Sequence, residues 1–191
     1  MTAINYLGNS RSAATLPALL QCLDDPNTSV SFAAARALGM IKQKPGIVVP
    51  ALVRALRRAS FTPAWNQPDL RSAVASALVG FGTNADVAVP ELLLHLSRAN
   101  ENDPILYLLI TTLRSVSAQP DAIVPTLTTY LQSTNDNLRQ YAASSLASFG
   151  PRAQSALKSL TNALQFPDTR GVVADAIRRI SSDASTNATP Q

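Results

Sequence analysis

Few side chains in this chain of 191 residues could carry out catalysis. It has one histidine, His95, and one cysteine, Cys22, whereas a hydrolytic triad or a metal site needs several such groups together. One cysteine can form neither an internal disulfide nor a cysteine-based zinc site. No Gly-x-Ser-x-Gly elbow, phosphate-binding loop or dinucleotide fingerprint occurs in the sequence. We therefore expect no catalytic residue, no metal and no cofactor, with His95 as a half-buried packing residue and Cys22 as a small core residue.

Side chains suited to binding gather in residues 57–69, which read RRASFTPAWNQPD. This segment holds the only tryptophan, Trp65, together with Phe61, Arg57 and Arg58. Exposed aromatic residues beside arginine are typical anchors for a protein partner. In the alternative interpretation, Phe61 and Trp65 fold back and cover a neighbouring helix. The sequence leaves both interpretations open.

A repeat positions these residues. A seven-residue phrase with leucine at its third and seventh positions occurs five times, and the starts are 33, 40, 35 and 33 residues apart. The copies begin at Pro17, Pro50, Pro90, Pro125 and Lys158. Self-similarity at such a period is typical of a stacked array, in which each unit buries its apolar face only against its neighbours. The connection at 57–69 is about twice as long as its equivalents, so we expect it to project from the rim.

A second apolar pattern follows each phrase. Apolar or small residues recur 3, 4, 7, 8 and 11 positions after five anchors, which are Val30, Leu70, Ile105, Leu138 and Thr169. That spacing predicts an apolar stripe along one side of an α-helix. Each unit is therefore expected to be a helix (A), a turn and a second helix (B). An aspartate stands shortly before each B helix and is expected to cap it; these are Asp24, Asp69, Asp103, Asp136 and Asp168.

The sequence resembles HEAT-repeat proteins, and within them the short bacterial HEAT-like repeats related to the phycobilisome lyases. The resemblance rests on the Pro-x-Leu-x-x-x-Leu phrase, the aspartate before helix B, an arginine near its start (Arg71, Arg139, Arg170) and Ala-Leu-Gly phrases such as Ala37-Leu38-Gly39. Lys158 replaces the proline of the last phrase, and Ser31 and Leu106 replace the arginine in the first and third units. The resemblance implies an all-α fold, a right-handed α-solenoid of about five helical hairpins plus a partial N-terminal repeat.

The expected organisation follows from these patterns. We expect repeats at about 13–42, 46–82, 86–117, 121–150 and 152–181. Residues 1–12 are expected to be the end of a B helix and thus a partial repeat, while 182–191 form a polar, disordered tail. Loss of the preceding A helix would leave an apolar edge near Leu16 and Leu19, through which copies of the chain could associate.

The resemblance also implies that B helices line a concave surface. Their expected non-core positions supply a shallow basic floor, formed by Arg36, Arg71, Arg114, Arg139, Arg170 and Arg178. Alternatively, several of these arginines pair with the aspartate before their own or the next helix, at about 0–1 kcal/mol for an exposed pair. In the third B helix, Leu106, Tyr107 and Ile110 occupy such positions and indicate either a contact patch or tighter packing.

Three functions are compatible with this sequence. The first is a non-catalytic scaffold that binds a protein or peptide on the concave face or through the 57–69 loop. The second is nucleic-acid binding, which the resemblance extends to HEAT-like DNA glycosylases, with Trp65 and Asp69 as the residues that would matter. The third is a role like that of a bilin lyase or chaperone, implied only by the resemblance. The formal net charge of +4 permits an acidic partner without requiring one, and no run is long enough to cross a membrane.

Overall fold

The secondary structure of the described residues is entirely helical. The computed structural model describes residues 4, 8, 12–61, 63, 68–117 and 120–182. The five A helices are α2 (Leu16–Leu23), α4 (Pro45–Arg58), α6 (Val89–Arg98), α8 (Val124–Tyr130) and α10 (Leu157–Ala163). The five B helices are α3 (Thr28–Ile41), α5 (Leu70–Val79), α7 (Ile105–Val116), α9 (Asp136–Phe149) and α11 (Arg170–Ser181). The expected all-α fold of solenoid type is confirmed, and each predicted phrase lies wholly or almost wholly in an A helix.

Short 3-10 turns lead into four of the A helices and into the last B helix. They are η1 (Ala13–Thr15), η2 (Gly82–Ala88), η3 (Pro120–Ala122), η4 (Gly150–Ala156) and η5 (Pro167–Thr169). Prolines fall in the first turn of the A helices α2, α6 and α8, where a missing amide costs little because the first helical amides have no partner within the helix. These three helices therefore begin where the phrase predicted, whereas α4 begins at Pro45 and contains Pro50 within the helix.

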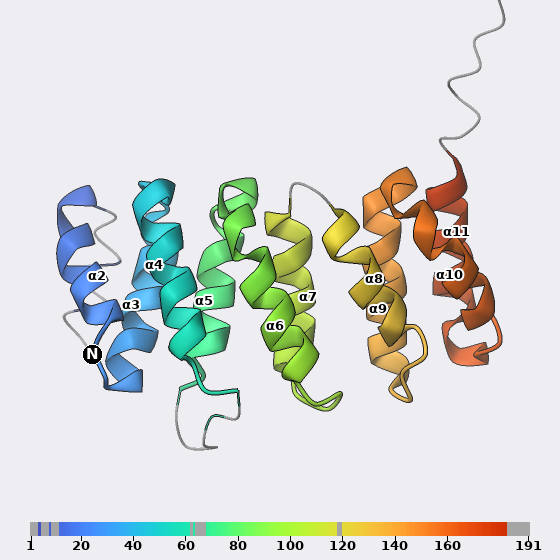
Figure 1. The fold of residues 1–191 in the computed structure, drawn as a ribbon, viewed down its shortest axis with the longest axis horizontal. Coiled ribbons are helices and arrows are strands. Elements are labelled where there is room, and N and C mark those ends of the chain that lie inside the picture. Colours follow the sequence, from blue (N-terminus) through green and yellow to red (C-terminus); the bar gives the residue numbers. More distant parts are fainter. Residues whose placement is uncertain are drawn as a thin grey trace, which may run out of the picture. The chain divides into compact units, whose positions relative to one another are not determined.

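The chain forms two compact units. The first contains residues up to 99 together with 111–118, and the second contains 100–110 and the residues from 119 onward, so α7 is shared. In the first unit, α2 packs against α3, α4 packs against α5, and the B helices α3 and α5 pack against each other. In the second unit, α8 packs on α9, α10 on α11, and α9 on α11. Figure 1 shows the two helices of each of these pairs side by side.

The B helices of the first unit approach each other closely at glycine. A Cβ atom on Gly39 would lie 2.7 Å from the Cα atom of Ala77 in α5, and one on Gly8 would lie 2.8 Å from the Cβ atom of Ala37 in α3. Real Cβ atoms do not come so near, so only glycine fits these two positions. This contact is the physical reason for the Ala-Leu-Gly phrase.

The core consists of the leucines that the repeat predicted. Leu38, Leu78, Leu113 and Leu146 lie at equivalent positions of successive B helices, and each is fully buried. Leu16 and Leu19 of α2 are buried as well. The expectation of an exposed apolar edge at these two residues was wrong, because α2 packs its apolar side against α3 and α4.

Two of the five predicted aspartate caps are confirmed. Asp69 Oδ1 accepts from the Arg71 amide at 2.9 Å, and Asp103 Oδ1 accepts from the Ile105 amide at 3.1 Å. Both carboxylates satisfy an amide that lacks a partner within its helix.

The other three predicted caps were wrong. Asp24 terminates α2, Asp136 is the first residue of α9, and Asp168 lies within η5. Asn27 caps α3 and Asn135 caps α9 through their side-chain oxygens. Asparagine and aspartate cap about equally well, so the residue that takes the extended backbone conformation directly before the helix becomes the cap.

Parts of the expected organisation fall outside the described residues. These are most of the partial repeat at 1–12 and the tail from residue 183 onward. Within the described part, every helix is too short or insufficiently apolar to span a bilayer.

Candidate partner-binding site

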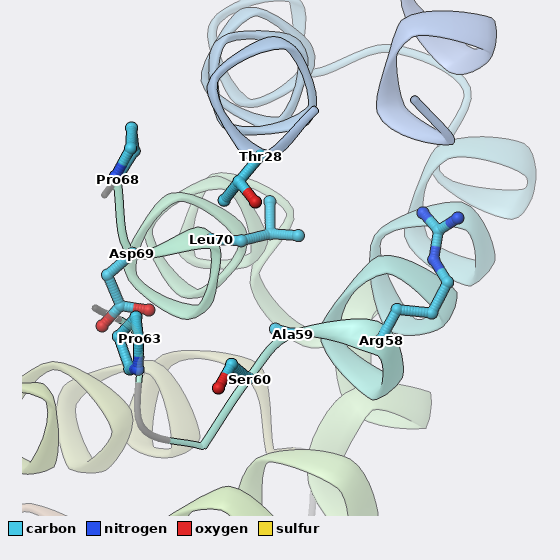
Figure 2. A pocket seen from close by; sticks show the side chains of 8 residues that line it. All are labelled: Thr28, Arg58, Ala59, Ser60, Pro63, Pro68, Asp69 and Leu70. Carbon is cyan, nitrogen blue, oxygen red and sulfur yellow. The ribbon is translucent and has the colours of Figure 1, made fainter. Parts of the chain in front are cut away.

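A pocket of about 210 Å³ lies between the start of α3, the end of α4 and the loop that joins α4 to α5 (Figure 2). Its lining combines apolar and polar side chains, namely Thr28, Arg58, Ala59, Ser60, Pro63, Pro68, Asp69 and Leu70. Figure 2 shows Thr28 and Leu70 next to each other, with the Arg58 side chain directed away from them. The lengthened loop of the second repeat thus forms one wall of this pocket, which we call the loop pocket.

Arg57 and Arg58, at the end of α4, are exposed but already paired. Arg58 Nη2 donates to the Leu23 carbonyl at 3.0 Å and lies 2.9 Å from Asp24 Oδ1. Arg57 Nε donates to Glu91 Oε2 of α6 at 2.9 Å. The two arginines therefore connect α4 to the A helices on either side of it. Because such partly exposed pairs contribute only about 0–1 kcal/mol, both can exchange these contacts for a partner at little cost.

The ring of Phe61 contacts two side chains of α6 in the first unit. Its ring lies 4.4 Å from the imidazole of His95, with 27° between the planes, and the Arg98 guanidinium carbon lies 4.5 Å from the Phe61 ring centre. The side chain of Phe61 is half-buried. The interpretation in which the loop folds back on a neighbouring helix therefore describes Phe61. Trp65, the other aromatic residue of the loop, lies outside the described residues.

His95 is fully buried rather than half-buried. Its Nε2 lies 3.0 Å from the Leu56 carbonyl and 3.8 Å from Glu91 Oε1, while Nδ1 has no hydrogen-bond partner. Burial lowers the pKa of His95 below the ordinary value of 6.5, and this effect exceeds the opposing influence of the Leu56 carbonyl and the Glu91 carboxylate. The ring is therefore neutral at neutral pH, with its proton on Nε2, where it donates to the carbonyl.

Arg71 does not contribute to a basic floor, because it is only 2% exposed. Its Nη1 donates to the Phe61 carbonyl at 2.7 Å, and Nε and Nη2 donate to the Asp69 carboxylate at 2.9–3.2 Å. The alternative interpretation, pairing with the aspartate before its own helix, is confirmed for Arg71. The side chain closes the loop onto the start of α5.

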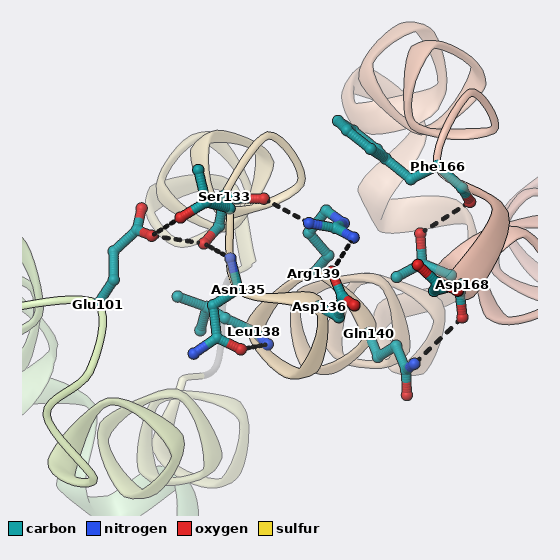
Figure 3. Close-up of polar contacts among 11 residues, drawn as sticks. Glu101, Ser133, Asn135, Asp136, Leu138, Arg139, Gln140, Phe166 and Asp168 are labelled. Carbon is teal, nitrogen blue, oxygen red and sulfur yellow. Dashed lines mark hydrogen bonds and ion pairs between the residues drawn. The ribbon is translucent and has the colours of Figure 1, made fainter.

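Arg139 in the fourth repeat likewise joins a carbonyl of the preceding turn to an aspartate, and it is 5% exposed (Figure 3). It donates to the Ser133 carbonyl at 2.7 Å and to Asp136, and its guanidinium lies 4.3 Å from the Phe166 ring centre. Its Nε has no partner. Arg139 is thus a second buried member of the predicted floor, and the pairing interpretation is confirmed for it too.

The remaining four arginines of the predicted floor are exposed: Arg36, Arg114, Arg170 and Arg178. Arg170 Nε donates to the Leu164 carbonyl at 3.1 Å, and Arg178 pairs with Asp175 on its own helix. Arg36 lies 5.9 Å from the Phe32 ring centre. A continuous basic floor is therefore absent from the described B helices, although these four side chains remain accessible.

The proposed contact patch on α7 is largely buried. Leu106 and Ile110 are fully buried, and Tyr107 is half-buried with its ring edge-on to that of Tyr141 at 5.3 Å. The alternative interpretation, tighter packing in this unit, fits Leu106 and Ile110.

The positions one and five residues after the anchor are also buried in the first, second and fourth repeats, at Ser31, Ala35, Arg71, Ala75, Arg139 and Ala143. Each of these B helices packs both on its own A helix and on another B helix, so it is buried on two sides and its core stripe is wider than the periodicity predicts.

Two residues of this site were missed by the sequence analysis. Glu91 is buried between Arg57 and His95, and Arg98 covers Phe61. A usable signal was present, because Glu91, His95 and Arg98 are spaced four and three residues apart and so lie on one face of α6. Within the described part of the chain, no three His, Cys, Asp or Glu side chains gather closely enough to hold a metal ion.

Comparison with known proteins identifies one relationship. A family model described as HEAT repeats matches residues 1–64, which include the first complete repeat, all of α4 and the start of the loop. The match supports a HEAT-repeat protein and does not bear on the phycobilisome-lyase branch. HEAT repeats are commonly protein-interaction scaffolds and are generally non-catalytic. The comparison with curated proteins gives no match.

Proposed function

We propose that this protein is a non-catalytic scaffold that binds a protein or peptide partner at the loop pocket. The observation that carries the proposal is that the one lengthened turn of the array forms a wall of this pocket. Insertions in repeat arrays commonly lie at binding faces, and aromatic residues beside arginine are frequent anchors. Trp65 is the anchor we propose, with Arg57 and Arg58 at the rim.

The composition of the loop pocket favours recognition over catalysis. Its only carboxylate, Asp69, is already bound to the Arg71 amide and guanidinium. Its hydroxyl groups, on Thr28 and Ser60, have no histidine among the other lining residues to act as a base. Proline, alanine and leucine supply the rest of the surface apart from Arg58, as expected for a pocket that accepts an apolar side chain of a partner.

The inner face of the B helices, which is the concave surface implied by the resemblance, is a weaker candidate binding site than the loop pocket. Burial of Arg71 and Arg139 removes two of its six arginines, and burial of Leu106 and Ile110 removes most of its apolar patch. Its other predicted side chains are at least partly exposed, namely Arg36, Arg114, Arg170, Arg178 and Tyr107. The same loss weakens the case for nucleic acid, whose binding depends on many phosphate contacts.

The test is partner capture from host lysate by the purified chain at low and at moderate salt. Two variants alter the proposed site, Trp65→Ala in the loop and Thr28→Tyr in the pocket wall. Arg36→Glu, on the exposed side of α3, is the matched control for the inner face. We expect a protein partner that survives moderate salt, is lost with both site variants and is retained by the control.

Other outcomes of this capture contradict the proposal. Loss of the partner with Arg36→Glu alone would move the interface to the inner face. Recovery of nucleic acid only, declining steeply as salt rises, would replace the scaffold with a nucleic-acid-binding protein.

A further inference from the structure

Exposed apolar side chains gather on the A helices of the first unit. Within the described part of the chain, four large apolar residues are exposed, and three of them lie in α4, η2 and α6. These are Ile47, Val87 and Leu94, which are 56%, 62% and 38% exposed. We propose that they belong to a second docking surface, whose partner is an acidic amphipathic helix of another protein. The proposal goes beyond the loop pocket and does not depend on it.

Equivalent positions in the five repeats show that this apolar character is particular to two of them. The residues three before and four after the start of each seven-residue phrase are exposed in every repeat. The earlier position holds Ala14, Ile47, Val87, Ala122 and Ser155, and the later one holds Gln21, Arg54, Leu94, Thr129 and Asn162. Small or polar residues therefore suffice there for an A helix to form. Packing of the array does not explain the three large apolar side chains.

The helices α4 and α6 are neighbours in the first unit (Figure 1). Arg57 Nε of α4 donates to Glu91 Oε2 of α6 at 2.9 Å, and His95 Nε2 of α6 lies 3.0 Å from the Leu56 carbonyl of α4. The turn η2, which leads into α6, also packs on α4. The exposed side chains of the second and third repeats therefore belong to one continuous surface.

Helical spacing arranges these side chains in two rows. Ile47 and Arg54 are seven residues apart in α4, and Val87 and Leu94 are seven residues apart in η2 and α6. Residues with this spacing lie on the same side of a helix, about two turns apart. We call these four side chains the outer patch. Amphipathic helices commonly bind by laying their apolar side along an apolar surface between helices.

The charge of the outer patch favours an acidic partner. Arg54 makes no side-chain hydrogen bond or ion pair with any described residue, and Arg57 on the same helix is 65% exposed. The three elements α4, η2 and α6 together contain four arginines and two carboxylates, so arginine is in excess. Of the two carboxylates, Asp86 is exposed, whereas Glu91 is buried and paired with Arg57. Carboxylates beside the apolar side of a partner helix would complement this charge.

A second copy of this chain fits the outer patch less well. Contact through the same patch would bring together two surfaces with an excess of arginine, which is unfavourable. In the second unit, α8 and α10 and the turns before them present small or polar residues at the equivalent positions, such as Ala122 and Thr129. No large apolar side chain is exposed among the described residues of that unit. The chemistry of the patch therefore favours a segment of a different protein.

Designed peptides test the proposal directly. The probe is a fluorescently labelled helix of about 20 residues, long enough to be helical in water, with leucine along one side and glutamate and alanine elsewhere. A second peptide carries lysine in place of glutamate, and a third has the composition of the probe in scrambled order. Fluorescence anisotropy measures the affinity of each peptide for the full chain. We expect saturable binding of the probe and at least about tenfold weaker binding of the other two.

Variants that copy residues from another repeat should remove binding without disturbing the fold. Val87→Ala and Leu94→Thr introduce the residues that the fourth repeat carries at these positions. Together they should lower the affinity for the probe by at least about tenfold, because the burial of two apolar side chains is lost. Arg54→Glu should weaken binding of the probe and strengthen binding of the lysine peptide. Lys158→Glu, in the fifth phrase, is the matched charge control and should change neither affinity.

Several outcomes overturn the proposal. These are the absence of saturable binding, equal binding of the probe and the lysine peptide, and an affinity that the double variant leaves unchanged. Adsorption of the chain to phosphatidylcholine–phosphatidylserine vesicles without peptide binding, abolished by the double variant, would assign the patch to a membrane surface. A dimer in sedimentation equilibrium that the double variant dissociates would assign it to a second copy.

The test is separate from that of the scaffold proposal. Thr28→Tyr, in the loop pocket, should leave the affinity for the probe unchanged. Loss of probe binding with Thr28→Tyr would move the peptide to the loop pocket and overturn the outer patch as its site. Failure to capture a partner at the loop pocket does not affect the peptide titrations, and circular dichroism verifies that each variant remains folded.

Discussion

Two connections between an A helix and a B helix are held in the same way although they differ in length. One joins α4 to α5 in the first unit, and the other joins α8 to α9 in the second. Each is closed by an arginine one residue after the anchor of its B helix. Arg71 reaches the carbonyl of Phe61, ten residues earlier, and Arg139 reaches that of Ser133, six residues earlier. Both bonds are 2.7 Å long. Closure by arginine therefore does not require a turn of fixed length.

The two connections differ in how they use their carboxylates and aromatic rings. Asp69 both caps α5 and pairs with Arg71, whereas in the second connection Asn135 caps and Asp136 pairs. Phe166 covers Arg139, but Phe61 faces His95 and Arg98. The longer connection thus adds a pocket wall and the ring of Phe61, which stacks on the buried His95 of α6.

Removal of the closing arginine should have the largest effect on stability. We expect Arg71→Ala to lower the free energy of unfolding by about 3 kcal/mol, because a buried ion pair and a carbonyl contact are lost together. Arg139→Ala should cost less, about 2 kcal/mol, since Asp136 is 52% exposed against 25% for Asp69 and stays better hydrated. Urea denaturation of each variant measures both values. Equal losses would show that the difference in carboxylate exposure is irrelevant.

The capping residues should show a smaller difference in the same direction. Asp69→Ala removes a cap and the partner of a buried arginine, and we expect a loss of about 2 kcal/mol. Asn135→Ala removes only a cap and should cost about 1 kcal/mol. Thermal unfolding followed by circular dichroism distinguishes the two. If Asn135→Ala proves the more harmful, the division of roles described above is incorrect.

The two phenylalanines should differ in their dependence on pH. At pH 8, Phe61→Leu and Phe166→Leu should each cost about 1 kcal/mol through loss of a cation–π contact. At pH 5.5 the cost of Phe61→Leu should shrink, because the unmodified chain is itself destabilised there by the lowered pKa of buried His95. The cost of Phe166→Leu should stay constant. Denaturation curves at both pH values provide the comparison.

The exposed member of the arginine series should have the smallest effect. Arg170 occupies the equivalent position in the fifth repeat and also donates to a carbonyl of its own turn, that of Leu164. Because its side chain is exposed, Arg170→Ala should cost no more than about 0.5 kcal/mol. A loss as large as that for Arg139→Ala would show that burial does not determine the contribution of this arginine.

The repeating elements were predictable from sequence because they depend on local spacing. The Pro-x-Leu-x-x-x-Leu phrase located the A helices, and the spacing after Leu70 or Leu138 located the B helices. Each of these signals comes from residues within one helix, where periodicity and burial are directly related.

The features that the sequence left open or predicted wrongly depend on residues distant in the chain. Arg71 looked like a surface residue because its carbonyl partner lies ten residues earlier in an atypical loop. Leu106 and Ile110 looked exposed because one helix alone does not reveal how many neighbours cover it. Burial of His95 beneath Phe61 depends on contact between residues 34 positions apart, which no local pattern encodes.

Closure by arginine has a consequence for engineering of this scaffold. In each connection, a stretch of chain lies between the carbonyl that accepts from the arginine and the residue that caps the B helix, and the length of this stretch differs between the two connections. Doubling the length of a flexible loop costs only about 0.6 kcal/mol. A foreign recognition peptide grafted between Ser133 and Asn135 would therefore leave the bond from Arg139 to Ser133 available to hold the graft's base. The second unit could in this way be given a display loop comparable to the one that the second repeat already carries.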